Sequence, residues 1–185
     1  MYFDRTRSEL IEVAPGLYRG GHPEAQKFQQ IKGLGIKQVL RLNAEELDVV
    51  QEYSEAAGGE LLLHHVPVNP WIIPPEDTVC RILHILSTHT GKSLYVHCWF
   101  GRDRTGLVIS LYRTVFQGWS VENALAEMRG HGFAEELSHF PEALRHYTSH
   151  VRKVIGCGNP FEHFACRGLK CCDSAVSNHL GDQGT

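Results

Sequence analysis

The stretch YVHCWFGRDRTGLVIS, residues 95–110, joins two patterns of different period and decides how the rest of the chain is interpreted. An apolar run ends at His97 and Cys98, as a buried strand does. A polar turn with one glycine and two arginines follows, and from Leu107 the apolar residues recur at helical spacing. The sequence therefore predicts a strand, a short loop and a helix, with a cysteine where the strand enters the loop.

The segment from Cys98 to Arg104, called the cysteine loop below, has the composition of an anion-binding site. A loop between a strand and a helix can turn successive backbone N–H groups inward, and the helix dipole adds positive potential. Gly101 permits a tight path, Arg104 offers a planar fork for two phosphate oxygens, and the Thr105 hydroxyl can donate to sulfur. Because positive potential favours a thiolate, we expect Cys98 to be a nucleophile that faces phosphorus.

The spacing of this motif is specific. The pattern H-C-x-x-G-x-x-R-[ST]-G would arise by chance on the order of once in a million in a chain of this length, at average residue usage. Cysteines are also common in protein cores, but a core thiol has no need of the sequence GRDR beside it. We therefore interpret Cys98 as a reactive residue.

Strand and helix patterns alternate along the rest of the chain. Strands are predicted at 16–19, 36–42, 61–68 and 94–97. Helices are predicted at 23–33, at 45–57, from 75, from 107, at 121–129 and over 133–154. Ser120 is the expected cap of the helix at 121–129, and Pro141 interrupts the apolar stripe of the last helix. This order predicts an α/β fold with a largely parallel sheet that is covered on both faces. We expect one catalytic domain over 1–156 and a partly disordered tail with several cysteines over 157–185.

Composition and charge exclude several classes of function. A net charge of −3 argues against general attraction to nucleic acid or membranes. The first twenty residues lack the apolar run of a signal peptide, and no stretch approaches the 18 apolar residues of a membrane span. We expect a cytoplasmic protein without stable membrane insertion, whose six cysteines are thiols, with Cys80 as one candidate redox partner for Cys98. His64 and His65 are adjacent on a predicted strand and point to opposite faces, so we expect no metal and no cofactor.

The cysteine loop resembles the signature H-C-x5-R-[ST] of the cysteine-dependent protein tyrosine phosphatases. The segments LYRGGHP (17–23), IKQVLRLN (36–43), HHVPVNPW (64–71) and LYRTVFQGWSVENALAEMRGHGF (111–133) extend the resemblance to the small bacterial dual-specificity phosphatases. The resemblance implies a single-domain fold with a four- or five-stranded sheet, a phosphocysteine intermediate and no metal. It makes Cys98 the nucleophile and Arg104 the phosphate clamp, with the backbone of 99–103 as the cradle and His97 as the residue that sets hydrogen bonds around the cysteine.

The general acid is harder to assign. The family resemblance implies an aspartate on a loop about 20–30 residues before the cysteine, where a positioned acid contributes about 10²–10⁴-fold. That window holds Glu76 and Asp77, while the chain has Trp71-Ile72-Ile73 where many relatives carry an acid beside the tryptophan. Asp77 is the first candidate and Glu76 an alternative. Asp103 is the other alternative, because some relatives that handle phosphoinositides use an aspartate at this place in the loop.

Several further side chains of the loop are candidates for substrate contact. Trp99 and Phe100 either form an apolar rim or point into the core. Arg102 is either a rim charge for a second phosphate or a solvated arginine, and Arg19 is expected to stabilise a turn. The predicted substrate-binding set is Trp99, Phe100, Gly101, Arg102, Asp103 and Thr105.

The sequence therefore predicts a phosphatase acting on phosphotyrosine in a phosphorylated protein or peptide, and it leaves open whether phosphoserine and phosphothreonine are substrates as well. Two further alternatives remain open. The first keeps the loop and changes the substrate to an inositol phosphate or a phosphoinositide, as Arg102 and Asp103 suggest. The second is a phosphate-binding pseudophosphatase, because the acid beside Trp71 is missing.

Overall fold

The computed structural model describes residues 7–44, 61–89 and 93–155. Its centre is a five-stranded sheet in the order β1-β2-β5-β3-β4. The strands are β1 (Ile11–Ala14), β2 (Leu17–Gly21), β3 (Gln38–Arg41), β4 (Leu62–His65) and β5 (Leu94–Cys98). β1 pairs antiparallel with β2, and every other neighbouring pair is parallel. The predicted α/β fold with a mostly parallel sheet is confirmed.

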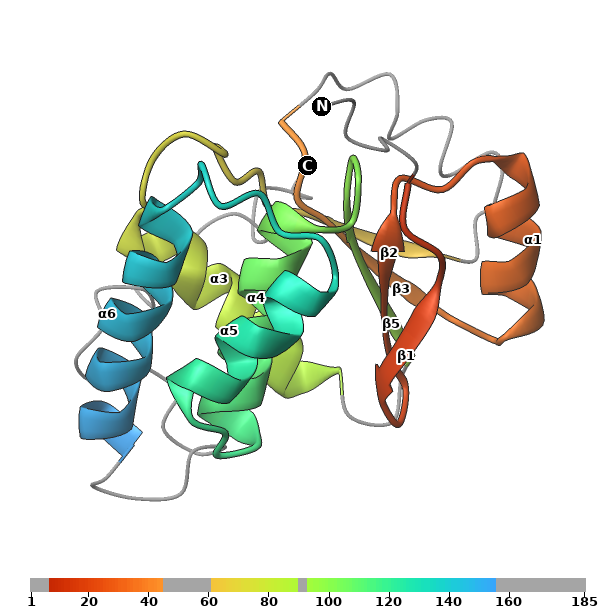
Figure 1. Ribbon diagram of the computed structural model, residues 1–185. Helices are drawn as coiled ribbons and strands as arrows, with labels where there is room; N and C mark the ends of the chain where they lie inside the picture. Colours follow the sequence, from red (N-terminus) through yellow and green to blue (C-terminus); the bar gives the residue numbers. More distant parts are fainter. Residues whose placement is uncertain (1–6, 45–60, 90–92, 156–185) are drawn as a thin grey trace, which may run out of the picture.

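Helices lie on both sides of this sheet, as Figure 1 shows: α1 covers one face, and α3 to α6 gather on the other. Their bounds are α1 (Ala25–Gly33), α3 (Glu76–Thr88), α4 (Asp103–Phe116), α5 (Val121–Gly130) and α6 (His139–Ile155). The helix predicted at 45–57 and the tail at 157–185 lie outside the described residues. No described helix is long and apolar enough to cross a membrane.

Two apolar clusters hold these layers together. The larger one joins the sheet to α3–α6, with Val96 of β5, Leu107 of α4 and Phe140 of α6 among its buried members. The smaller one lies under α1 and includes Phe28 and Ile31. Because β5 is the central strand and both faces are covered, it is buried along its whole length, which explains the continuous apolar run before Cys98.

Two boundaries differ from the sequence-based expectation. The edge strand β1 was not predicted, since half of its residues are exposed and it lacks a continuous apolar run. The last helix begins at His139 and not at Phe133. Pro141 lies in its first turn, where a missing N–H costs nothing, so this proline marks the start of α6 and does not interrupt it.

Candidate active site

Cys98 is the last residue of β5, at the carboxyl edge of the sheet. Only 2% of its surface is exposed, and its sulfur accepts a hydrogen bond from the Gly101 N–H at 3.3 Å. The sulfur therefore lies on the inner side of the cysteine loop, beside at least one of its amides. Cys98 is free, whereas Cys80 is disulfide-bonded, so the expectation that all six cysteines are thiols is wrong. Cys80 is therefore not available as a thiol partner for Cys98.

The carbonyl groups of the cysteine loop are held from outside the loop. Ser8 donates from both its N–H and its Oγ to the Phe100 carbonyl, each at 3.0 Å, and the His22 N–H donates to the Trp99 carbonyl at 2.9 Å. Carbonyl and N–H groups of one peptide unit point in opposite directions because the unit is planar. Holding these carbonyls outward therefore turns the adjoining amides toward the interior of the loop, as an anion nest requires.

Gly101 occupies a position that no other residue fits. Its φ is +76°, in the left-handed region. A Cβ there would lie 2.1 Å from Ser8 Oγ and 2.3 Å from the Gly20 carbonyl carbon. The loop is thus pressed directly against the β2 backbone and the segment that precedes β1.

Arg19 is a buried charge beside the loop, with a larger role than the turn expected from the sequence. It lies on β2, is only 2% exposed, and donates from Nη2 to the Gly101 carbonyl at 3.0 Å. Burial lowers the pKa of Arg19, while the nearby charges of Glu127 and Cys98 oppose that shift. Arg19 therefore fixes the third consecutive loop carbonyl and brings positive charge near the sulfur. The signal available in the sequence was an arginine inside the predicted strand segment LYRGG.

His97 and Tyr95 form a buried layer beside the nucleophile. Burial, together with the charge of His22, lowers the pKa of His97 well below its usual range, so its ring is neutral at pH 7. Nδ1 of His97 lies 3.3 Å from the Cys98 carbonyl oxygen. The Tyr95 hydroxyl donates to the Gly21 carbonyl at 2.6 Å, and burial raises its pKa. The histidine therefore contributes orientation and not positive charge.

Arg104 and Thr105 lie in the first turn of α4, immediately after the loop. Arg104 is half-buried. Thr105 is fully buried, and its Oγ1 has no hydrogen-bond partner among the described residues. A buried hydroxyl without a partner is costly in a protein interior, so an acceptor such as the Cys98 thiolate would suit it.

The three candidate acids lie in different surroundings. Glu76 and Asp77 form the first turn of α3 and face α6, where their charges help to raise the pKa of Tyr147 after burial, the larger cause. Glu76 also lies 4.0 Å from Nε2 of His150. Asp103 Oδ1 accepts a hydrogen bond from the Ala134 N–H at 2.9 Å, which ties the start of α4 to the segment before α6.

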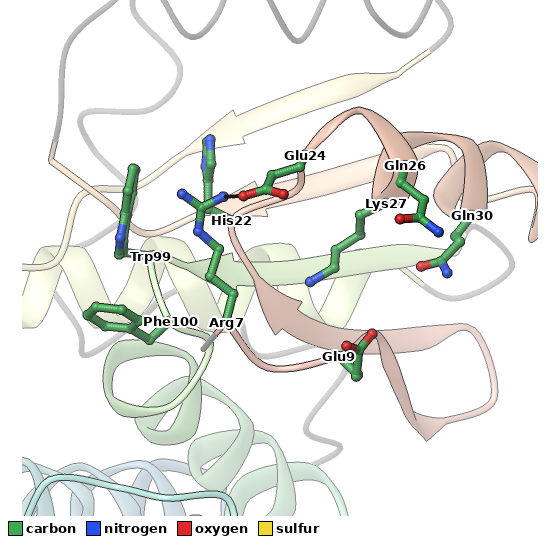
Figure 2. Close-up of a pocket in the computed structure, with 9 residues that line it drawn as sticks. All are labelled: Arg7, Glu9, His22, Glu24, Gln26, Lys27, Gln30, Trp99 and Phe100. Carbon is green, nitrogen blue, oxygen red and sulfur yellow. Dashed lines mark hydrogen bonds and ion pairs between the residues drawn. The ribbon is translucent and has the colours of Figure 1, made fainter. Parts of the chain in front are cut away.

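The remaining loop side chains divide between two places. Trp99, 37% exposed, and Phe100 line a cavity between the loop and α1 and do not point into the core (Figure 2). Arg102 lies on the other side, where its Cδ would be 3.4 Å from a Cβ added at Gly132. Among the described residues no group of three or more metal-binding side chains gathers.

The fold and this geometry define an α/β protein that holds a buried cysteine inside a tight loop whose carbonyls are held outward. The chain belongs to the tyrosine phosphatase family, whose model matches residues 7–155.

Two curated relatives are named as phosphatases of different substrate classes. The chain is 26% identical over 145 residues to the dual specificity protein phosphatase TpbA of Pseudomonas aeruginosa, covering 77% of this chain and 61% of TpbA. It is 28% identical over 123 residues to the inositol diphosphatase DSP3 of Arabidopsis thaliana, covering 65% of this chain and 60% of DSP3. The chain thus spans about three-fifths of the length of these relatives.

Solved structures show the same fold. The core catalytic domain of the PP-IP phosphatase SIW14 from S. cerevisiae, in complex with citrate, matches with a TM-score of 0.68 at 23% identity, covering 83% of this chain and 94% of that one. A structure of P. aeruginosa TpbA in complex with pTyr matches with a TM-score of 0.66 at 21% identity, covering 85% of this chain and 100% of that one. The expected phosphatase-like fold is confirmed.

Proposed function

We propose that this chain is a phosphatase that hydrolyses phosphate monoesters through a cysteinyl-phosphate, with phosphotyrosine in proteins or peptides as its first substrate. The observation that carries this proposal is the geometry of the cysteine loop. Its sulfur accepts from a loop amide, while donors outside the loop hold its carbonyls outward. Such an arrangement stabilises both a thiolate and a phosphate dianion at the same point.

The chemistry proceeds in two steps. In the first, the Cys98 thiolate attacks phosphorus in line, the P–S bond forms, and the P–O bond to the leaving group breaks as Asp77 gives that oxygen a proton. In the second, Asp77 takes a proton from water, the water oxygen attacks phosphorus, and the P–S bond breaks to release inorganic phosphate and the thiolate. Arg104 and the loop amides hold the equatorial oxygens, and the Thr105 hydroxyl supports the departing sulfur.

Asp77 stays the proposed acid because its two rivals are already engaged by other groups. Asp103 Oδ1 accepts a hydrogen bond from the Ala134 N–H at 2.9 Å. Glu76 lies 4.0 Å from Nε2 of His150. A general acid must be able to reach the leaving oxygen with its proton, which favours Asp77 over both.

The proposal is tested with Cys98→Ser. We expect turnover of p-nitrophenyl phosphate to fall by about 10⁴-fold or more, because a neutral hydroxyl is a far weaker nucleophile than a thiolate, while vanadate or phosphate still binds. Lys32→Met, at an exposed position in α1, is the control and should keep wild-type turnover. Substantial residual activity in Cys98→Ser would refute a thiolate nucleophile, and a wild-type chain that binds phosphate without turnover would be a pseudophosphatase.

A second candidate function is hydrolysis of an inositol phosphate. Two relatives favour it by name, an inositol diphosphatase and a PP-IP phosphatase. The loop chemistry is the same for both substrate classes, so the surroundings of the loop must distinguish them. Comparing kcat/KM on a phosphotyrosine peptide with kcat/KM on an inositol phosphate separates the two.

A further inference from the structure

The peptide unit between Phe100 and Gly101 contacts the nucleophile directly. Its N–H, that of Gly101, donates to the Cys98 sulfur at 3.3 Å. Its carbonyl, that of Phe100, points the opposite way, because the unit is planar and trans. Any group that binds the Phe100 carbonyl therefore fixes the direction of the N–H that reaches the sulfur.

One residue, Ser8, supplies two donors to this carbonyl. The Ser8 N–H and the Ser8 hydroxyl each donate to the Phe100 oxygen at 3.0 Å. A carbonyl oxygen has two lone pairs, so Ser8 alone fills its accepting capacity. The Trp99 and Gly101 carbonyls, which other residues bind, belong to different peptide units. Ser8 is thus the residue that holds the peptide unit whose N–H lies on the sulfur.

The position of Ser8 is fixed by distant parts of the chain. Its own carbonyl accepts from the Gly21 N–H at 3.1 Å and from Nζ of Lys27 in α1 at 2.8 Å. A Cβ added at Gly101 would lie 2.1 Å from the Ser8 hydroxyl oxygen, so this side chain is pressed against the loop. The segment before β1 is therefore a built part of the loop's outer wall.

These hydrogen bonds form one chain, from Ser8 through the peptide unit to the Cys98 sulfur. Linked hydrogen bonds polarise one another, by about 10–30% per bond. Two donors on the Phe100 oxygen draw electron density toward it, which makes the Gly101 N–H a stronger donor. Hydrogen bonding to the charged form of a group favours that form. The chain therefore favours a thiolate over a thiol at Cys98.

We propose that Ser8 is a positioning residue for the nucleophile, which acts through the Phe100–Gly101 peptide unit to stabilise the thiolate of Cys98. The inference rests on the proposed function of the cysteine loop and deepens it, because it gives the segment before β1 a part in the chemistry. Ser8 sets both the direction and the strength of the amide from which the sulfur accepts.

The test measures the rate of alkylation of Cys98 by iodoacetamide against pH, followed by mass spectrometry of the peptide that contains Cys98. Ser8→Ala removes the hydroxyl donor and keeps the N–H donor. We expect alkylation at pH 5.5 to slow about two- to fourfold, part of the value of one hydrogen bond. At pH 9.5 the rates should be equal, because the cysteine is then mostly ionised in both proteins. Ser8→Thr keeps a hydroxyl and should restore most of the rate.

Turnover gives a second measurement. The acidic limb of kcat/KM on p-nitrophenyl phosphate reports ionisation in the free enzyme, so it should move to higher pH in Ser8→Ala. The matched control is Ser87→Ala, because the Ser87 hydroxyl donates to the His84 carbonyl at 2.8 Å within α3, away from the loop. This variant should leave both curves unchanged. The other ionisable side chains around the cysteine are the same in every variant: Arg19 of β2, Tyr95 and His97 of β5, and Arg104 of α4.

Alkylation curves that coincide for the wild type and a Ser8→Ala variant shown to be folded by urea denaturation overturn the proposal. A loss of rate by the same factor at pH 5.5 and pH 9.5 also overturns it, since that result means a distorted loop and not a weaker amide. A Ser8→Thr curve that follows Ser8→Ala does so as well. Iodoacetamide reacts with the cysteine without any phosphate ester, so the result judges Ser8 even if the proposed hydrolysis fails.

Discussion

The geometry of the cysteine loop depends on the buried guanidinium of one residue, Arg19. A buried charge is costly unless it is paired. Glu127 is the carboxylate whose charge most favours the charged form of Arg19. However, Arg113 already binds Glu127 through three hydrogen bonds of 2.6–3.2 Å. Cys98 is the other group whose negative form would favour the charged guanidinium. Arg19 therefore places a buried positive charge where it would favour a thiolate at Cys98.

We predict that Arg19→Met slows alkylation of Cys98 by iodoacetamide about tenfold at neutral pH, the effect of about 1.4 kcal/mol of lost stabilisation of the thiolate. Arg19→Lys, which keeps the charge and loses the planar fork, should restore part of the rate. The groups that face this site from neighbouring elements are Tyr95, His97, Glu127, His131 and Arg113. Equal alkylation rates in a folded Arg19→Met variant and in the wild type would contradict a role for this charge.

The identity of the general acid can also be tested by substitution of single residues. We predict that Asp77→Asn lowers kcat on a phosphotyrosine peptide by about 10²–10⁴-fold and removes the dependence of kcat on a protonated acid. Asp103→Asn should keep most of kcat, because the Asp103 carboxylate accepts a hydrogen bond from the Ala134 N–H and is not the proposed acid. Glu76→Gln is the matched control in the same turn of α3. The assignment is wrong if Asp103→Asn abolishes that pH dependence while Asp77→Asn leaves it intact.

At the scale of elements, the loop is positioned by packing on two sides. The segment before β1 and the strand β2 hold the loop carbonyls, while α5 packs closely on α4. A Cβ at Gly106, in the first turns of α4, would lie 2.9 Å from Met128 of α5. The Ser110 hydroxyl also donates to the Ala124 carbonyl at 3.2 Å. The helix that carries Arg104 is thus fixed by α5.

The N-terminal cap of α5 gives a prediction for stability. The Ser120 hydroxyl accepts a hydrogen bond from the Asn123 N–H at 3.1 Å, as predicted for a cap at this position. Ser120→Ala should lower the free energy of unfolding by about 1 kcal/mol, measured by urea denaturation, with kcat/KM unchanged. Ser120→Asp keeps an acceptor and serves as the control. Equal stability of the alanine and aspartate variants would show that the cap contributes nothing.

For the whole molecule, the buried neutral histidine links folding to pH. The pKa of His97 is lowered by burial in the folded state, and in the unfolded chain it returns to about 6.5. Below pH 6.5 the unfolded state therefore binds more protons, so stability falls as pH falls. The His97 contribution is fully present above the unfolded pKa.

We predict that urea denaturation at pH 5.5 gives a free energy of unfolding lower than at pH 7.5, with about 1 kcal/mol of the loss due to His97. In His97→Asn that part of the pH dependence should disappear. The pKa of His97 is also lowered by the charges of His22, Arg41 and Lys27. His97 is therefore the histidine chosen for substitution. An identical pH dependence in the wild type and in His97→Asn would contradict the assignment.

The sequence alone determined the local unit of strand, loop and helix that holds Cys98. A continuous apolar run before Cys98 and helical spacing after Leu107 can be recognised without any distant contact, because both patterns depend on local period. The same holds for the alternating order of strands and helices, for the Ser120 cap, and for the family resemblance. The start of α6 was missed by six residues, since Phe133 and Leu137 are buried although they precede the helix.

Only the tertiary structure decided what surrounds that unit. Ser8 lies 92 residues from Phe100 in the chain, and Arg19 lies 82 residues from Gly101, so no pattern of short period could connect them. β2 comes next to β5 through the parallel register of Gly21 with Cys98. That pairing brings the N-terminal segment and α1 to the loop, buries Arg19 beneath it and creates the cavity beside it. Contacts between distant segments depend on how the sheet is ordered, and strand order is a property of the whole fold.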